Sequence, residues 1–187
     1  AIIQQKAINL TYQSFKARQA NSFDFHPYHL KEFRNRWFVI GVKKKNSPIM
    51  NLALDRIISI KESKLPYYRD NNFDADDYFK NVIGVSVSPT LEPIEVVLYV
   101  THVHSPYITT KPLHHSQKVL SRDNYGITIS INVQYNFELE KEILSYGDGI
   151  KVISPNNLRR NITNRINGAI DLYKTELSKS GLKSMTQ

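Results

Sequence analysis

Residues 27–41, which read PYHLKEFRNRWFVIG, decide how the rest of the chain is interpreted. The second half of this stretch, residues 37–41, is a run of aromatic and β-branched residues that is typical of a strand buried on both faces. The first half brings Tyr28 and His29 together with several cations. Cations beside a buried strand form either a solvated rim or a binding site for anions. The remainder of the sequence bears on that choice.

The positive charge of the chain is concentrated in its first third. The net charge is +8 over 187 residues. Residues 1–64 contain twelve Lys or Arg and four Asp or Glu, whereas residues 65–187 contain thirteen of each class. The whole excess therefore lies in the part that includes residues 27–41. Such a local positive field favours anionic partners, and the alternative is a merely soluble basic domain.

Composition limits the compartment and the kinds of site. There is no cysteine, which excludes disulfides and thiolate metal sites and favours a reducing cytoplasm. No apolar run approaches the length that spans a bilayer, and no signal-peptide pattern opens the chain. We therefore expect a cytoplasmic protein that does not enter the membrane.

The first half of the chain predicts a small β-barrel. Alternating or apolar runs predict strands at residues 8–15, 23–33, 36–42 and 50–60, joined by tight turns. Pro27 interrupts the second strand and indicates an edge or a bulge, because proline donates no hydrogen bond to a ladder. Arg56 falls on an otherwise apolar face of the last strand and needs a partner there.

The second half predicts a different architecture. A short helix at residues 74–82, with Asp74 as its N-cap, precedes a proline-containing linker at residues 86–93. The pattern after the linker is strand, short helix, two strands, a helix capped by Asn136, a strand and a long amphipathic helix. This order matches a ferredoxin-like βαββαβ unit with an extra C-terminal helix. We predict an α+β protein with domains at residues 1–85 and 86–187.

One group of residues near the organising stretch is the candidate binding site. Arginine forks bind phosphate oxygens in pairs, hydroxyl groups add single hydrogen bonds, and aromatic rings stack on bases. The alternative is a rim of structural ion pairs, in which Arg56 pairs with Asp55 or Glu32. The candidate residues are Tyr12, Ser14, Tyr28, His29, Arg34, Arg36 and Arg56.

Other chemistry finds less support in the sequence. His102, His104, His114 and His115 have no acidic or cysteine ligand beside them, so we interpret them as surface histidines and not as a zinc site. The arginines after residue 158 fit the solvated face of an amphipathic helix better than a nucleic-acid contact. No nucleophile, base and orienting group can be placed together. We expect neither an enzyme nor a bound cofactor or metal.

Several motifs in order give a resemblance to a known family. PYHLKEFRNRWFVIG followed by LALDRI resembles the WYL domain of bacterial transcription regulators, with Trp37-Phe38-Val39 at the Trp-Tyr-Leu triplet. FDADDYFKNVIGVSV, KPLHHSQ and ELEKEILSYGDGIKVISP resemble the remainder of such regulators, including the C-terminal extension called WCX. Phe38 replaces the tyrosine of the triplet and lacks its hydroxyl group.

The resemblance implies a fold, a ligand and partners. It implies an Sm-like or SH3-like barrel, a ferredoxin-like C-terminal domain, and a basic barrel pocket that senses a nucleotide or single-stranded nucleic acid. The matching positions are Tyr12, Ser14, Tyr28, His29, Arg36 and Arg56. Family members bind promoter DNA through an N-terminal helix-turn-helix, so residues 1–7 would be the end of its linker. We expect a homodimeric effector module; the alternative is an oligomerisation module without a small ligand.

Overall fold

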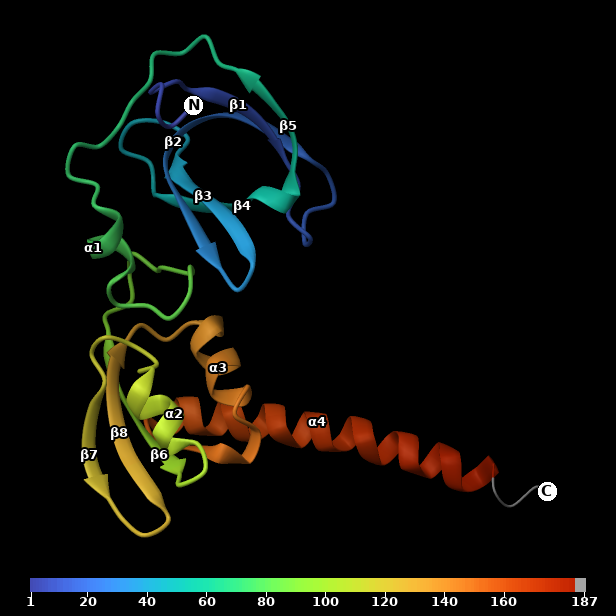
Figure 1. The fold of residues 1–187 in the computed structure, drawn as a ribbon. Coiled ribbons are helices and arrows are strands. Elements are labelled where there is room, and N and C mark those ends of the chain that lie inside the picture. Colours follow the sequence, from blue (N-terminus) through green and yellow to red (C-terminus); the bar gives the residue numbers. More distant parts are fainter. Residues whose placement is uncertain (184–187) are drawn as a thin grey trace. The chain divides into compact units, whose positions relative to one another are not determined.

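The computed structural model describes the backbone of residues 1–183 and the side chains of residues 1–174. The chain forms two compact units (Figure 1). Unit 1 contains Ala1–Lys80 and Gly84–Val87, and unit 2 contains Asn81–Ile83 and the residues from Ser88 onward. Both units combine antiparallel strands with short helices, so the predicted α+β class is confirmed.

Unit 1 is built on a five-stranded antiparallel sheet with the order β4-β3-β2-β1-β5. Its strands are β1 (Ile8–Tyr12), β2 (Asn21–Phe33), β3 (Arg36–Val42), β4 (Met50–Ala53) and β5 (Ile57–Glu62). The sheet curls so that its strands surround a common interior (Figure 1). Leu10, Phe25, Val39 and Leu52 form its buried core. Among the described residues no ladder joins β4 to β5, so the sheet has two edges and the closed barrel that the sequence predicts is not formed.

Proline 27 lies at a bulge in the middle of the sheet. The register of β2 against β3 shifts between Pro27 and His29, which confirms the predicted bulge. The predicted edge position is wrong, because β2 pairs with β1 on one side and β3 on the other. Gly41 lies opposite Pro27, and a Cβ atom added there would stand 2.1 Å from the carbonyl oxygen of His26. The two strands approach so closely that only glycine fits.

Two expectations for the neighbouring strands need correction. Residues 37–41 are not buried throughout, because the side chain of Trp37 is 51% exposed and full burial begins at Val39. Residues 50–60 are not one strand, because a 3-10 turn, η1 (Leu54–Arg56), separates β4 from β5. Arg56 therefore does not continue the apolar face of β4, as the strand pattern predicts, but leaves the sheet at this turn.

The segment after β5 returns along β2. The Tyr67 hydroxyl donates to the Pro27 carbonyl oxygen at 2.8 Å, and the Tyr68 backbone N–H donates to Nδ1 of His26 at 3.1 Å. Helix α1 (Ala75–Phe79) follows, and its predicted cap is confirmed, since Oδ1 of Asp74 accepts from the Asp77 N–H at 2.8 Å. The helix ends at Phe79, so it is shorter than the predicted residues 74–82.

Unit 2 is built on a four-stranded antiparallel sheet with the order β7-β8-β6-β9. The first turns of α4 lie over the core, where Leu158 and Ile162 are buried with the apolar residues of β6 and β8. Every residue from 163 to 174 is exposed, and in Figure 1 this part of α4 projects beyond the sheet. The elements are β6 (Ile94–Thr101), α2 (Ser105–Thr110), β7 (Lys118–Arg122), β8 (Gly126–Val133), α3 (Phe137–Leu144), η2 (Gly147–Gly149), β9 (Ile150–Ser154) and α4 (Asn156–Lys183).

Asn136 caps α3 as predicted, and this gives a stability prediction. Its Oδ1 atom accepts from the Leu139 N–H at 2.8 Å, and its Nδ2 atom donates to the Ile83 carbonyl oxygen at 3.0 Å. Asn136→Ala is expected to lower the free energy of unfolding of unit 2 by about 1–2 kcal/mol, because both bonds are lost at a helix end. Urea denaturation followed by circular dichroism measures this. Asn136→Asp keeps an acceptor for the Leu139 N–H and should recover part of the loss; equal losses in both variants would contradict the capping role.

Candidate functional site

Arg56 lies in a hollow on unit 1 that the turn η1 creates. The hollow has a volume of about 370 Å³ and is lined by Ser14, Phe15, Asp55, Arg56 and Ile58, among others. We call it the Arg56 hollow. The Arg56 carbonyl oxygen accepts from the Gln13 N–H at 3.1 Å, which fixes η1 against the segment that follows β1. Ser14 lies just past the end of β1, in that segment, and so reaches the same hollow.

The guanidinium group of Arg56 is incompletely satisfied. Its Nε atom is buried and has no hydrogen-bond partner among the described residues. The Cζ atom of Arg56 lies 4.2 Å from the centre of the Phe15 ring, in cation–π geometry. A buried donor without an acceptor costs free energy, so the Nε atom of Arg56 is left with an unmet hydrogen bond. Arg56 also lines the hollow, so an anion bound there would meet its guanidinium group.

Arg36 does not line this hollow, but it lies beside it through an ion pair with Asp55. Its Nε atom lies 3.3 Å from Oδ2 of Asp55, one of the lining residues. The alternative interpretation paired Asp55 with Arg56. In the structure Asp55 pairs with Arg36 instead. Arg36 and Asp55 are both close to half exposed, so their ion pair is weak and can be exchanged for a ligand phosphate.

Tyr28 and His29 lie at a different hollow of unit 1. This second hollow has a volume of about 720 Å³ and is lined chiefly by aliphatic side chains. We call it the apolar hollow. Tyr28 is 2% exposed, and its hydroxyl oxygen accepts from the Asp70 N–H at 3.3 Å. Burial raises the pKa of the Tyr28 hydroxyl. Tyr28 therefore anchors the segment that follows β5, while His29 remains partly exposed at the hollow.

Two further candidates lie in other settings. Arg34 is in the β2–β3 turn with a φ of 49°, and its guanidinium Cζ lies 5.7 Å from the centre of the Phe33 ring. Tyr12 packs against the core of unit 1. The structure thus brings Ser14 and Arg56 to one hollow, with Arg36 beside it on Asp55. It places Tyr28 and His29 at another hollow, and Arg34 and Tyr12 line neither.

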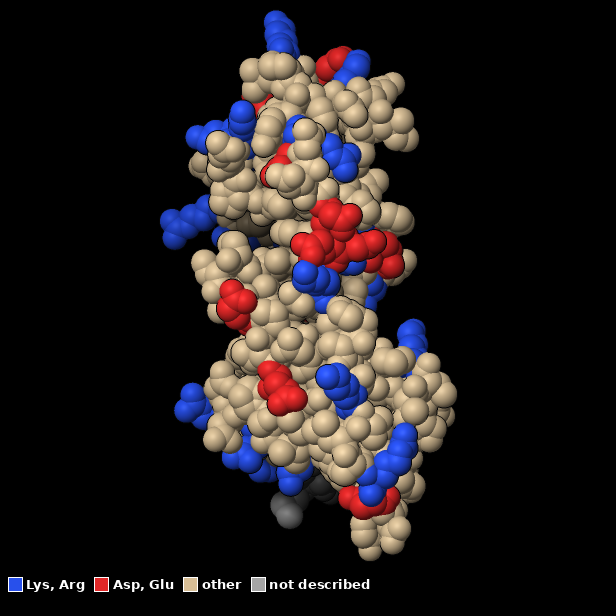
Figure 2. All heavy atoms as spheres, turned by 90° about the vertical axis from the view of Figure 1, so that its left-hand side faces the viewer, with Lys and Arg blue, Asp and Glu red and all other residues tan. Residues whose placement is uncertain are grey.

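The charged residues of unit 1 are not evenly distributed. Figure 2 shows acidic side chains gathered in a cluster on the face that carries α1, with Lys and Arg beside this cluster and scattered over the rest of the face. Asp70, Asp74, Asp76 and Asp77 are all exposed in this segment. The surface around α1 is therefore locally acidic and is a poor site for an anion.

His26 makes the stability of unit 1 depend on pH. Burial is the main cause that lowers the pKa of His26 below its ordinary value of 6.5, with the charge of Asp24 opposing it. Nδ1 accepts the Tyr68 N–H, so the folded protein holds the neutral ring. As the pH falls, the unfolded chain binds this proton first. We therefore expect this contribution to the free energy of unfolding to have its highest value above pH 6.5. It should decrease as the pH falls below 6.5 and level off below the pKa of His26 in the folded state.

Urea denaturation between about pH 5 and pH 8 measures this dependence. His26→Gln offers Tyr68 an acceptor that does not titrate, so it should remove this part of the slope. His29→Gln, three residues further along β2, should keep it. An unchanged slope in His26→Gln would contradict the assignment.

The remaining histidines bear on the zinc site that the sequence analysis considered. Within the described residues, no three His, Asp or Glu side chains gather as a metal ion would require. The rings of His114 and His115 lie 4.1 Å apart, and His104 packs edge-on against Tyr146.

No helix in the described part of the chain has the length and the apolar character needed to cross a bilayer.

Phe15 is the residue of the Arg56 hollow that sequence reasoning missed. Its side chain is 76% exposed, which is unusual for a phenylalanine next to a cation. The only sequence signal is an aromatic residue directly after Ser14, at the point where the apolar alternation of the first strand stops. Its pairing with Arg56 could not be predicted, because it depends on the turn η1.

Comparison with protein-family models finds two matches along the chain. The model of the WYL domain matches residues 1–62. The model of the WCX domain matches residues 92–170. Together the two matches cover more than half of the chain, in the order that the sequence resemblance implies. The comparison with curated proteins finds no match.

Two solved structures are similar to the chain over most of its length. One is the proteasome accessory factor B/C (PafBC) of Arthrobacter aurescens, with 16% sequence identity, 92% of this chain covered and a TM-score of 0.38. The other is a crystal structure of a CRISPR Cas-related protein, with 10% identity, 92% of this chain covered and a TM-score of 0.53. The chain spans 26% of the first protein and 49% of the second. The second likeness concerns the fold alone.

Proposed function

The chain belongs to the family of proteins in which a WYL domain is followed by a WCX domain, and on this premise we propose that it is the ligand-sensing and dimerising effector module of a bacterial transcription regulator. Its ligand in this proposal is a nucleotide or a single-stranded nucleic acid, bound at the Arg56 hollow. The module acts in the cytoplasm, binds without catalysis, and reaches promoter DNA through a DNA-binding domain outside these residues.

The observation that carries the proposal is the buried Nε atom of Arg56, which has no acceptor among the described residues. Ser14 adds a hydroxyl group, Phe15 adds an exposed ring on which a base can stack, and Arg36 adds a second guanidinium group. Among the described residues that line this hollow, Asp55 is the one carboxylate, and Arg36 beside the hollow already neutralises it. The hollow therefore carries a net positive charge with hydrogen-bond donors and a stacking surface, which suits a nucleotide phosphate and its base.

We further propose that both units follow the folds that the resemblance implies. The curled sheet of unit 1 supports an Sm-like or SH3-like arrangement whose β4 and β5 edges stay apart. The sheet order β7-β8-β6-β9, with α2 after β6 and α3 after β8, supports a ferredoxin-like unit 2. The long α4 would be the additional C-terminal helix.

The proposed mechanism is a shift between two arrangements of a dimer. A ligand changes such an equilibrium only by the difference of its affinities for the two states. An anion that engages Arg56 and displaces Asp55 from Arg36 would alter the contacts between η1 and β3, to which these residues belong. In the dimer, that change would favour one placement of the attached DNA-binding domains.

Fluorescence anisotropy with a labelled single-stranded oligonucleotide, competed by a panel of nucleotides, tests the proposal. We expect saturable binding that weakens with salt. Arg36→Ala/Arg56→Ala should reduce the slope of log K against log salt concentration by about 1.4, which is the loss of two phosphate contacts to a single strand. An oligomerisation module without a small ligand would show no saturable binding. The proposal would also be overturned if the wild-type protein and the double variant bound every anion with the same affinity.

A further inference from the structure

We propose that the apolar hollow of unit 1 is a second binding site, for a small amphiphile with an apolar body and one carboxylate head group. Its volume of about 720 Å³ lies within the range of about 300–1,000 Å³ that is usual for pockets that bind small molecules. This inference goes beyond the proposed sensing of nucleotides and does not depend on it, because the Arg56 hollow plays no part in it.

The wall of the hollow is apolar and comes from four strands of the curled sheet, with Leu30 as one of the residues from β2. Ile8 of β1, Val39 of β3 and Ile57 of β5 line it, and all three also pack on the core of unit 1. The hollow therefore extends the core toward the solvent. The residues that line it are already held in place by their packing on the core. Such preorganisation favours the binding of a ligand.

Exposed aliphatic side chains surround the opening. Leu30, Leu54 and Ile60 all line the hollow and all count among the exposed large hydrophobic residues of the described chain. Ile3 is a fourth such residue. Scattered exposed aliphatic residues are normal, but several around one hollow indicate a binding surface. Covering them with an apolar body would remove their surface from water.

Two polar side chains at the hollow can recognise a head group. The Tyr28 hydroxyl is engaged by the Asp70 N–H, whereas the Gln4 amide and the His29 imidazole make no hydrogen bond to another described residue. Both groups can donate hydrogen bonds to a carboxylate. The positive charge of residues 1–64 favours an anionic head group over a neutral or cationic one.

Strand β5 provides a matched pair of variants, because its register against β1 shifts between Thr11 and Tyr12. Ile60 lines the apolar hollow, whereas Ile58 lines the Arg56 hollow. Both side chains are 60% exposed, so neither substitution removes a core residue. Ile60→Glu and Ile58→Glu therefore make the same chemical change on the same strand at two different hollows.

The experiment is a titration with decanoate below its micelle-forming concentration, followed by calorimetry and by amide NMR spectra. We expect saturable binding, with the largest shifts at the amides of Leu30, Val39 and Ile60, which line the apolar hollow and not the Arg56 hollow. Ile60→Glu should weaken binding by at least about tenfold, because the new carboxylate opposes both the apolar body and the head group. Ile58→Glu should change it by less than about twofold. Decanol should bind more weakly than decanoate, and His29→Ala should reduce that difference.

Three results would overturn the inference. They are the absence of saturable binding, shifts confined to the Arg56 hollow, and equal losses in Ile58→Glu and Ile60→Glu. Decanol binding as tightly as decanoate would refute the carboxylate recognition. The same variants are tested with the oligonucleotide, where only Ile58→Glu should weaken binding, so failure at one hollow is distinguishable from failure at the other.

Discussion

Replacing Gly41 with alanine is expected to lower the free energy of unfolding of unit 1 by about 3 kcal/mol. The new Cβ atom would stand 2.1 Å from the His26 carbonyl oxygen and 2.9 Å from two atoms of the Phe25 ring. The first contact is with the backbone of β2, and the second is with a core side chain that is fully buried. Neither neighbour can move alone, since Gly41 pairs with Pro27 at the bulge.

Urea denaturation followed by Trp37 fluorescence measures this loss, because Trp37 is the single tryptophan of the chain and lies in β3. Gly168→Ala is the matched control. A Cβ atom at Gly168 meets no atom within 4 Å in α4, so this change should stabilise the helix by about 0.5–1 kcal/mol, as circular dichroism would show. Retention of wild-type stability in Gly41→Ala would show that β2 and β3 do not approach as closely as described.

Replacing Arg56 with alanine is expected to weaken binding of the single-stranded oligonucleotide by about ten- to a hundredfold. Hydrogen bonds to a charged group contribute about 1.5–3 kcal/mol, which corresponds to this range. Arg56 offers several donors in a rigid fork, and its Nε atom has no competing acceptor among the described residues. Arg56→Lys keeps the charge but loses the fork, so it should recover only part of the affinity.

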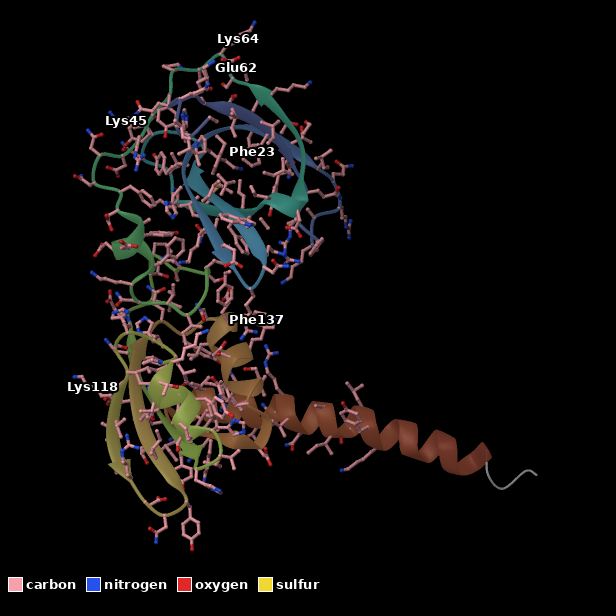
Figure 3. All side chains as sticks on the ribbon, viewed as in Figure 1. Phe23, Lys45, Glu62, Lys64, Lys118 and Phe137 are labelled. Atoms are coloured by element: carbon pink, nitrogen blue, oxygen red, sulfur yellow. The ribbon has the colours of Figure 1, made fainter. Side chains whose placement is uncertain are left out.

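A second control separates this specific contact from the overall charge. Lys64 is exposed, and in Figure 3 it points away from the curled sheet, close to Glu62. Lys64→Ala removes the same unit of charge from unit 1 and should weaken binding by no more than about twofold. Equal losses in Arg56→Ala and Lys64→Ala would mean that the general positive field, and not the Arg56 hollow, binds the oligonucleotide.

Arg56→Ala is also informative about the free protein. The substitution removes a buried donor that lacks an acceptor and a cation–π contact with Phe15. The first change favours the folded state and the second opposes it by about 0.5–1 kcal/mol. We therefore expect a change in the free energy of unfolding of less than about 1 kcal/mol, so a loss of binding would not arise from unfolding.

Local signals made much of the fold predictable. Asp74 and Asn136 cap helices because their side chains bond to backbone groups only three residues away, and such contacts depend on the sequence itself. The alternation of strands and helices after residue 93 is equally local. The break at η1 is not a local signal. The turn is held by the Gln13 N–H, which lies in the segment after β1 and donates to the Arg56 carbonyl oxygen. The alternation of residues 50–60, which predicts one continuous strand, therefore does not reveal that contact.

The candidate site was predictable in composition but not in arrangement. The charge concentrated in residues 1–64 directed attention to unit 1, and a cation on an apolar strand pattern directed it to Arg56. The division into two hollows follows the turn η1 and the register shift between β1 and β5, since Ile58 lines one hollow and Ile60 the other. Tyr28 lines the apolar hollow but is 2% exposed, and its hydroxyl oxygen accepts from the Asp70 N–H, a contact that the sequence does not reveal.

The most direct test of the account observes the Nε–H group of Arg56 by NMR during titration with a nucleotide. The account predicts that this resonance shifts, exchanges more slowly with water and saturates together with the Ser14 and Phe15 amides, because the ligand supplies the acceptor that Nε lacks. Assignment of the resonance rests on its absence from Arg56→Lys. An Arg56 resonance that stays unchanged while other arginine side chains shift would contradict the central claim.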